Sequence, residues 1–144
     1  MTTLTRFMLD TNTVSYMLKG QSPKARRKLE KLSEEEEVCL SAITEGEIRY
    51  GLAKRVLRPE TQDNIERFLD TIDILPWDSD AARVYGSMRA KLEAAGRPVN
   101  NLDLLIGAHA IAAEAVLVTN DRVFRNFGPS LRTVAWATDL SSRS

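Results

Sequence analysis

Short, wholly apolar segments alternate with helical patterns along this chain of 144 residues. Apolar runs bounded by turn-forming residues predict strands at residues 6–9, 38–41, 73–76, 115–119 and 133–135. Amphipathic or alanine-rich stretches predict helices at residues 13–19, 23–32, 59–71, 78–95 and 103–113, and another that opens at Thr44. Apolar strands separated by helices are typical of a parallel sheet covered on both faces. We therefore predict one α/β domain over residues 1–144, with a central parallel sheet of four to five short strands.

Local signals refine these boundaries. Gly20 should end the first helix, and Asp78 is a suitable N-cap for the long helix that follows it. Gly51 should interrupt or bend the helix that opens at Thr44. The four consecutive glutamates at residues 34–37 predict a solvated turn before the second strand.

Acidic residues fall where these strands end or where helices begin. Asp10 and Asp121 follow the first and fourth strands, and Glu47 and Asp103 lie near the starts of two helices. In an open parallel sheet, ligands bind beyond the carboxyl ends of the strands, so all four acids should open on that edge. A carboxylate at the edge of a core is costly to desolvate without a cation. Four together predict an oxygen-rich site for a hard divalent cation.

Each of these acids also has a purely structural interpretation. Asp10 could cap the next helix, although Thr11 and Asn12 are alternative caps, so its carboxylate is not needed there. Asp103 opens an apolar helix whose dipole favours an acid, and Asp121 lies in a turn-prone stretch. The four acids at one edge are a more specific signal than any one of them. Asn12 could instead hydrogen-bond to the Asp10 carboxylate and orient it.

Glu47 has the strongest structural alternative. Residues 44–47 match a capping box, in which Glu47 would reach back to the backbone N–H of Thr44. Glu45 also competes with Glu47 for a place in the site, because residues two apart on a helix point to different sides. Spacing alone therefore does not decide whether Glu47 caps the helix or enters the site, nor whether Glu45 or Glu47 is the site residue.

Composition adds little about partners. The 20 basic and 20 acidic residues cancel, so net charge does not argue for nucleic acid. The segment from Lys19 to Lys31 contains six basic residues and one acid. It is interpreted either as a solvated helix face or as a surface that contacts phosphates. Cys39 lies in an apolar run, and we expect a buried, inert thiol. The lone His109 is expected to be a core residue or a support to the site, because one histidine is a poor zinc signature.

No segment approaches the roughly 20 apolar residues of a membrane span, and the amino terminus shows no signal-peptide pattern. We therefore expect a cytoplasmic protein that does not enter a membrane. Trp77 and Trp136 are expected to be packing residues rather than base-stacking ones.

Several segments of the chain match one known family in order: residues 8–12, 41–44, 47–51, 96–99, 103–110 and 117–121. With these segments the chain resembles the PIN-domain ribonucleases, and more narrowly the VapC-type toxins of bacterial type II toxin–antitoxin pairs. The resemblance covers essentially the whole chain and implies a three-layer α/β/α sandwich. Because the family's glutamate precedes an Arg-Tyr-Gly segment, it maps to Glu47 rather than to Glu45.

The resemblance also assigns the remaining acids. Asp10 and Asp103 map onto the family's most dependable metal ligands. Many relatives carry the last acid just before a phenylalanine, where this chain has Val123, so Asp121 becomes the candidate for that position. The implied residues are the metal ligands and catalytic groups Asp10, Glu47, Asp103 and Asp121, with Asn12, Thr119 and Asn120 hydrogen-bonded to them.

The activity implied by the resemblance is hydrolysis of RNA phosphodiesters with Mg²⁺, for which Mn²⁺ can substitute. The implied enzyme is an endoribonuclease toxin that inhibits translation, with tRNA as the favoured substrate. The implied partners are a second copy in a homodimer and a VapB-type antitoxin, which blocks the acidic groove in a larger assembly.

Two other functions compete with this interpretation. A haloacid-dehalogenase-like phosphatase would carry a second aspartate at position 12, where this chain has Asn12. A receiver domain would carry an acidic pair near the first strand and a late lysine, and neither is present. A catalytically inactive PIN-like module that binds RNA or protein is the remaining alternative, and the presence of all four acids argues against it.

Overall fold

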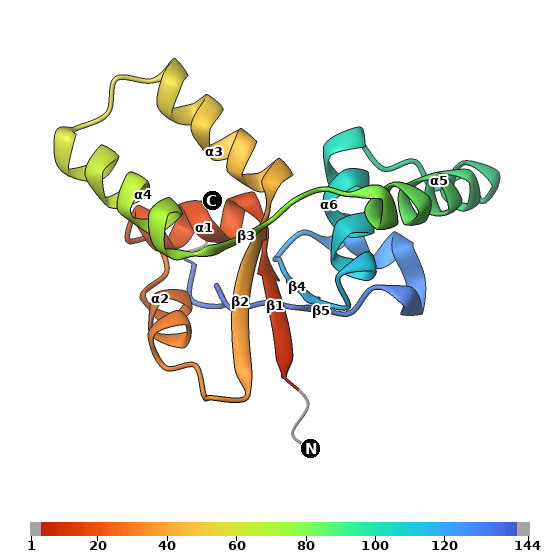
Figure 1. The fold of residues 1–144 in the computed structure, drawn as a ribbon, viewed down its shortest axis with the longest axis horizontal. Helices are drawn as coiled ribbons and strands as arrows, with labels where there is room; N and C mark the ends of the chain where they lie inside the picture. Colours follow the sequence, from red (N-terminus) through yellow and green to blue (C-terminus); the bar gives the residue numbers. More distant parts are fainter. Residues whose placement is uncertain (1–3, 141–144) are drawn as a thin grey trace.

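The computed structural model describes residues 4–140, in which five strands alternate with helices (Figure 1). In chain order the elements are β1 (Thr5–Leu9), α1 (Thr11–Leu18), α2 (Pro23–Glu30), β2 (Glu36–Ser41), α3 (Ala42–Lys54), α4 (Pro59–Thr71), β3 (Asp73–Leu75), α5 (Ser79–Ala94), α6 (Asn101–Ala112), β4 (Val116–Val118), the 3-10 helix η1 (Arg122–Ser130) and β5 (Thr133–Val134).

All five strands are parallel and lie in the order β3-β2-β1-β4-β5. The predicted parallel sheet and its three-layer architecture are therefore confirmed. From β1 the chain builds outward through β2 and β3, then crosses to the other side of β1 and adds β4 and β5. The strand order thus reverses between β1 and β4, and the crevice beyond the carboxyl ends at such a reversal is where open sheets bind ligands.

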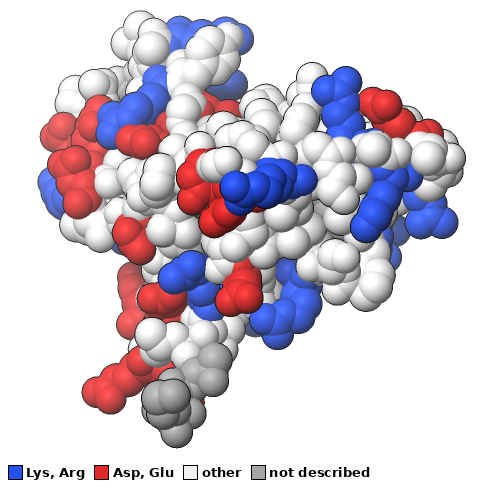
Figure 2. Space-filling view, turned by 45° about the vertical axis from the view of Figure 1, so that its right-hand side comes forward, with Lys and Arg blue, Asp and Glu red and all other residues white. Residues whose placement is uncertain are grey.

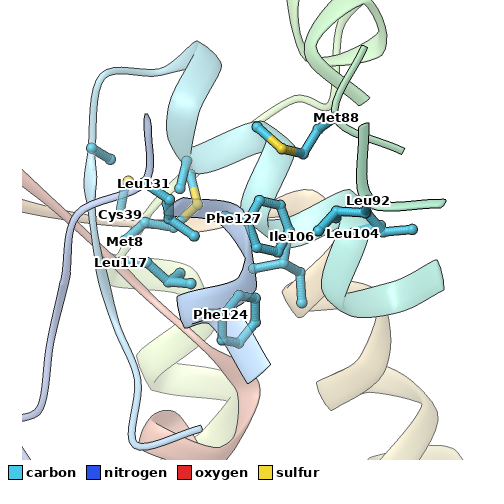
Figure 3. Close-up of a cluster of buried hydrophobic side chains, with 12 residues drawn as sticks. Met8, Cys39, Met88, Leu92, Leu104, Ile106, Leu117, Phe124, Phe127 and Leu131 are labelled. Carbon is cyan, nitrogen blue, oxygen red and sulfur yellow. The ribbon is translucent and has the colours of Figure 1, made fainter. Parts of the chain in front are cut away.

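Alternate strand residues enter two separate cores, because successive side chains point to opposite faces of a sheet. Met8 and Leu117 pack against α5, α6 and η1 (Figure 3), whereas Leu9 and Val118 pack against α1, α2 and α4. All four side chains are fully buried. Burial on both faces explains why the strands are apolar runs rather than alternating patterns.

Several predicted boundaries are confirmed. Gly20 follows α1 with a φ of +70°, a conformation that favours glycine. Asp78 is the N-cap of α5 and accepts a hydrogen bond of 3.1 Å from the backbone N–H of Ala81. Cys39 is buried, as expected.

One local prediction is wrong, another is wrong in part, and one element was not predicted. Helix α3 runs through Gly51 without interruption, since the helix-forming residues on both sides of this glycine continue its hydrogen bonding. The solvated turn predicted at residues 34–37 is confirmed for Glu34 and Glu35, which are exposed in a turn. It is wrong for Glu36 and Glu37, which begin β2 and pair with Lys28 at 3.3 Å and with Arg6 at 2.8 Å. The 3-10 helix η1 was not predicted, and its apolar residues enter the core that is shown in Figure 3.

Charges of both signs share one face of the molecule. Lysine, arginine and acidic side chains are interspersed on the face shown in Figure 2. Within the basic segment between Lys19 and Lys31, Arg26 forms an ion pair with Glu30 at 3.2 Å, and Lys28 forms one with Glu36 at 3.3 Å. Among residues 4–140, none of the helices combines the length and the apolar character that a membrane span requires.

Candidate functional site

A pocket of about 200 Å³ lies at the carboxyl ends of β1 and β4, where the strand order reverses. The structure brings all four predicted acids to it, and no lysine or arginine is among the described residues that line it. The acids come from four different elements or their caps: Asp10, Glu47, Asp103 and Asp121. Thr11, Asn12, Asn100, Leu102, Ile106 and Phe124 complete the lining.

Asp10 lies between β1 and α1 and is only 5% exposed. Its carboxylate caps α1 by accepting a 2.8 Å hydrogen bond from the backbone N–H of Thr13. The expectation that this carboxylate is not needed as a cap is therefore wrong. Burial raises the pKa of Asp10, and the charge of Asp121 adds to this, while hydrogen bonds from Thr119 and Thr13 oppose it. Asp10 is thus a costly carboxylate that a bound cation would stabilise.

Glu47 lies in the second turn of α3 and is half-buried. Its Oε1 atom accepts a 3.0 Å hydrogen bond from the hydroxyl of Thr11, which directs the carboxylate toward β1. Glu45, two residues earlier, instead forms a 2.8 Å ion pair with Arg49 and does not line the pocket. The assignment of Glu47 rather than Glu45 therefore agrees with the placement of the two side chains.

The capping-box interpretation of Glu47 is wrong. Helix α3 is capped by Ser41, whose hydroxyl accepts a 3.1 Å hydrogen bond from the backbone N–H of Ile43. Thr44 lies inside the helix, where its hydroxyl is buried without a partner. The helix therefore begins three residues earlier than the pattern indicated, which leaves the Glu47 carboxylate free for the pocket.

Asp103 lies in the first turn of α6 and is half-buried. Asn100, the N-cap, accepts a 3.0 Å hydrogen bond from the backbone N–H of Asp103 and donates a 2.6 Å hydrogen bond to its carboxylate. Burial raises the pKa of Asp103 most strongly, the Asn100 amide opposes this, and the charges of Asp121, Glu47 and Asp10 raise it further. The charges of the other three acids therefore oppose ionisation of Asp103.

Asp121 caps η1 by accepting a 3.0 Å hydrogen bond from the backbone N–H of Val123, and its side chain is exposed. Its own N–H donates to the Thr119 hydroxyl at 3.0 Å, and Thr119 also hydrogen-bonds to Asp10. Thr119 thus links two of the acids. Asn120 does not join them, because its amide donates to the carbonyl of Ala137 and the residue lies outside the pocket.

The carboxylates share the pocket without forming a closed ligand set. Within residues 4–140, no three His, Cys, Asp or Glu side chains form a group placed to hold a metal ion. His109 lies outside the pocket and is 3% exposed, with Nδ1 2.8 Å from the hydroxyl of Ser41. Burial lowers the pKa of His109, which fits the expected core histidine.

Comparison with known proteins places this chain in a family. Residues 7–128 match the family described as the PIN domain. The tRNA(fMet)-specific endonuclease VapC of Shigella flexneri is 35% identical over 133 residues, which are 92% of this chain and 98% of the relative. The chain belongs to the VapC-type PIN-domain ribonucleases. Ribonuclease VapC2 of Rickettsia felis is 34% identical and aligns with 80% of this chain and 86% of its own length.

Solved structures of this family have the same fold. The VapBC2 complex from Rickettsia felis, bound to a promoter DNA fragment, contains a chain with a TM-score of 0.83 and 32% identity. That match covers 91% of this chain and 98% of the other. The DNA-bound VapBC from Salmonella typhimurium gives a TM-score of 0.81 at 34% identity, with 92% and 99% coverage. The expected family and its fold are thus confirmed.

Sequence reasoning missed the contribution of Thr11 and of Asn100 as direct partners of two site carboxylates. For Asn100 a signal existed, because polar residues crowd the start of α6 beyond the needs of one cap. For Thr11 there was none, since its bond to Glu47 joins residues that are 36 positions apart.

Proposed function

We propose that this chain is a metal-dependent endoribonuclease that hydrolyses RNA phosphodiesters and acts as the toxin of a VapBC-type pair. The convergence of four carboxylates on one pocket without a lysine or arginine in its described lining carries this proposal. Such a pocket would repel an RNA phosphate unless a cation were bound. The names of the relatives, ribonuclease and endonuclease, support the same reaction.

The donor set fits Mg²⁺, with Mn²⁺ as a substitute, because every charged group in the pocket is a hard carboxylate oxygen donor. Asp10 and Asp103 would hold the ion directly, Glu47 would hold it directly or through water, and Asp121 would complete the set. A bound ion would lower the pKa of a coordinated water and neutralise charge on the phosphate.

The protein's own residues orient these ligands. Thr13 and Thr119 fix Asp10, Thr11 aims Glu47, and the Asn100 amide aims Asp103. Asp10 takes its hydrogen bonds from Thr13 and Thr119 rather than from Asn12, the predicted partner. Asn12 is exposed in the pocket lining, where its amide can donate to the RNA phosphate. The nearly closed environment of Asp10 keeps bulk water from screening the charges there.

We infer tRNA as the substrate class, because the relative from Shigella flexneri is named as specific for tRNA(fMet). We further propose a homodimer, neutralisation by a VapB-type antitoxin, and inhibition of translation in the cytoplasm. The related structures from Rickettsia felis and Salmonella typhimurium are VapBC complexes, which supports the antitoxin partner.

The test is incubation of the purified chain with total tRNA, with Mg²⁺ or EDTA, followed by mapping of the cut ends. Asp10→Asn and Asp103→Asn should lose cleavage, and the new amides retain the capping and hydrogen-bonding shapes. Glu45→Gln is the matched control, because Glu45 is an acid on α3 outside the pocket. Full activity in both aspartate variants, or in EDTA, would refute the assignment.

A catalytically inactive RNA- or protein-binding module is the competing function. It predicts no cutting of tRNA or ribosomal RNA by the folded chain, and RNA binding that does not change on chelation. Titration with Mn²⁺ separates the two, since a carboxylate pocket built for catalysis should bind the ion and lose that binding in Asp10→Asn.

A further inference from the structure

A strongly basic segment lies at the outer end of α3 and in its connection to α4. Residues 48–59 contain no acid and four cations, Arg49, Lys54, Arg55 and Arg58. Figure 1 shows this part of the chain projecting beyond the carboxyl edge of the sheet. We call residues 49–58 the basic arm. Two of its side chains are unusually accessible, since Tyr50 is 64% exposed and Val56 is fully exposed.

Most of the charge of the basic arm is not neutralised. Arg49 pairs with Glu45 at 2.8 Å and lies 3.7 Å from Glu66. None of the ion pairs formed within residues 4–140 includes Lys54, Arg55 or Arg58, although all three are exposed. Lys54, Arg55 and Arg58 are therefore available to bind an anion.

The basic arm is aligned with the acidic pocket by the geometry of α3. Glu47, Tyr50 and Lys54 are spaced at i, i+3 and i+7, so they follow one side of the helix. With a rise of 1.5 Å per residue, Lys54 lies about 10 Å along the axis from Glu47. A strand whose phosphate reaches Glu47 can therefore continue along the same side of α3.

A groove of about 220 Å³ connects the two regions. Arg55 lines it together with Thr11, Asn12 and Glu47, and these last three residues also line the acidic pocket. The rest of the groove is mainly apolar, with side chains from α1, α3 and α4. The groove that Arg55 lines therefore adjoins the acidic pocket through these three shared residues.

Tyr50 adds a group that recognises nucleic-acid bases. The Nζ atom of Lys54 lies 5.5 Å from the centroid of the Tyr50 ring, which leaves most of the ring accessible. An exposed aromatic ring beside cations is the combination with which proteins bind single-stranded nucleic acids, through base stacking and phosphate contacts.

We propose that the basic arm binds the substrate RNA beside the phosphate that is cut. Lys54, Arg55 and Arg58 contact successive phosphates, and Tyr50 stacks on an unpaired base. This inference rests on the proposed ribonuclease function and adds to it the surface that receives the RNA. Binding by the arm is independent of the metal, so it should affect KM rather than kcat.

The first test uses the RNA that the wild-type chain cuts among total tRNA and ribosomal RNA. Lys54→Ala/Arg55→Ala should raise KM at least tenfold and change kcat less than twofold. The slope of log(kcat/KM) against log salt should become shallower by about 1.4, since each lost single-strand phosphate contact contributes about 0.7. Lys91→Ala/Arg132→Ala removes the same charge from exposed positions on α5 and before β5, and none of the ion pairs within residues 4–140 includes either residue, so KM and slope should be unchanged.

The second test separates stacking from charge. Tyr50→Ala should weaken binding of the same RNA to the inactive Asp10→Asn chain at least about fivefold, whereas Tyr50→Phe should bind like the parent. Cutting by wild type with unchanged KM, slope and binding in the variants would overturn the inference and leave the nuclease assignment intact. If no RNA were cut or bound by wild type, the proposed function itself would fail, and the inference with it.

Discussion

Gly107 on α6 gives the sharpest test of the packing beside the site. A Cβ atom added there would lie 2.5 Å from Cζ and 2.6 Å from Cε2 of Phe127, about 1 Å short of ordinary contact. The Phe127 ring is 4% exposed and lies beside Ile106 and Phe124 (Figure 3), and its centroid is 5.9 Å from that of Phe124. The ring therefore has little room to move away.

Two opposing effects set the change in the free energy of unfolding that Gly107→Ala should cause. Helix propensity alone would stabilise the protein by about 1 kcal/mol, while overpacking of a buried site costs about 1–3 kcal/mol. We expect a net loss of about 1 kcal/mol in the free energy of unfolding. In a Phe127→Leu background the clashing atoms are absent, so the same substitution should stabilise by up to about 1 kcal/mol.

Urea unfolding of the four proteins in this double-mutant cycle measures the difference. The coupling between positions 107 and 127 should be about 2 kcal/mol, within the range found for residues in contact. An equal effect of Gly107→Ala in both backgrounds, or stabilisation of the wild-type protein, would refute this account of why the helix carries a glycine there.

Three further predictions concern single side chains. Burial raises the pKa of Cys39 to about 12, so thiol reagents should label it only after unfolding, and rapid labelling of the native chain would contradict this. Burial holds the pKa of His109 below its ordinary 6.5, so the unfolded chain binds a proton at this histidine at a higher pH than the folded chain does. The free energy of unfolding should therefore fall as pH drops through about 6.5, and in urea titrations the His109→Asn variant should lack this pH-dependent loss. Thr11→Val removes the hydroxyl that aims Glu47, so kcat should fall several-fold while the free energy of unfolding changes by less than about 1 kcal/mol; unchanged kcat would show that Thr11 does not position Glu47.

Much of the fold could be predicted because it depends on local patterns. The bounds of α4 match the helical periodicity at residues 59–71, and Asp78 caps α5 as its sequence context indicates. The start of α3 could not be predicted, because Ser41 is the cap and its hydroxyl also lies against His109, 68 positions away. The 3-10 helix η1 was missed because its register depends on two phenylalanines that pack beneath α6.

By itself, the sequence determined that a parallel sheet forms and that acids gather at its carboxyl edge, since both follow from where apolar runs end along the chain. Only the tertiary structure decided the partners of each acid. Thr119 reaches Asp10 while Asn120 turns to Ala137, and one continuous groove joins Glu47 to Arg55. The physical reason is that periodicity reports which face of an element is buried, whereas partners depend on strand register and helix rotation, which are set by contacts between distant parts of the chain.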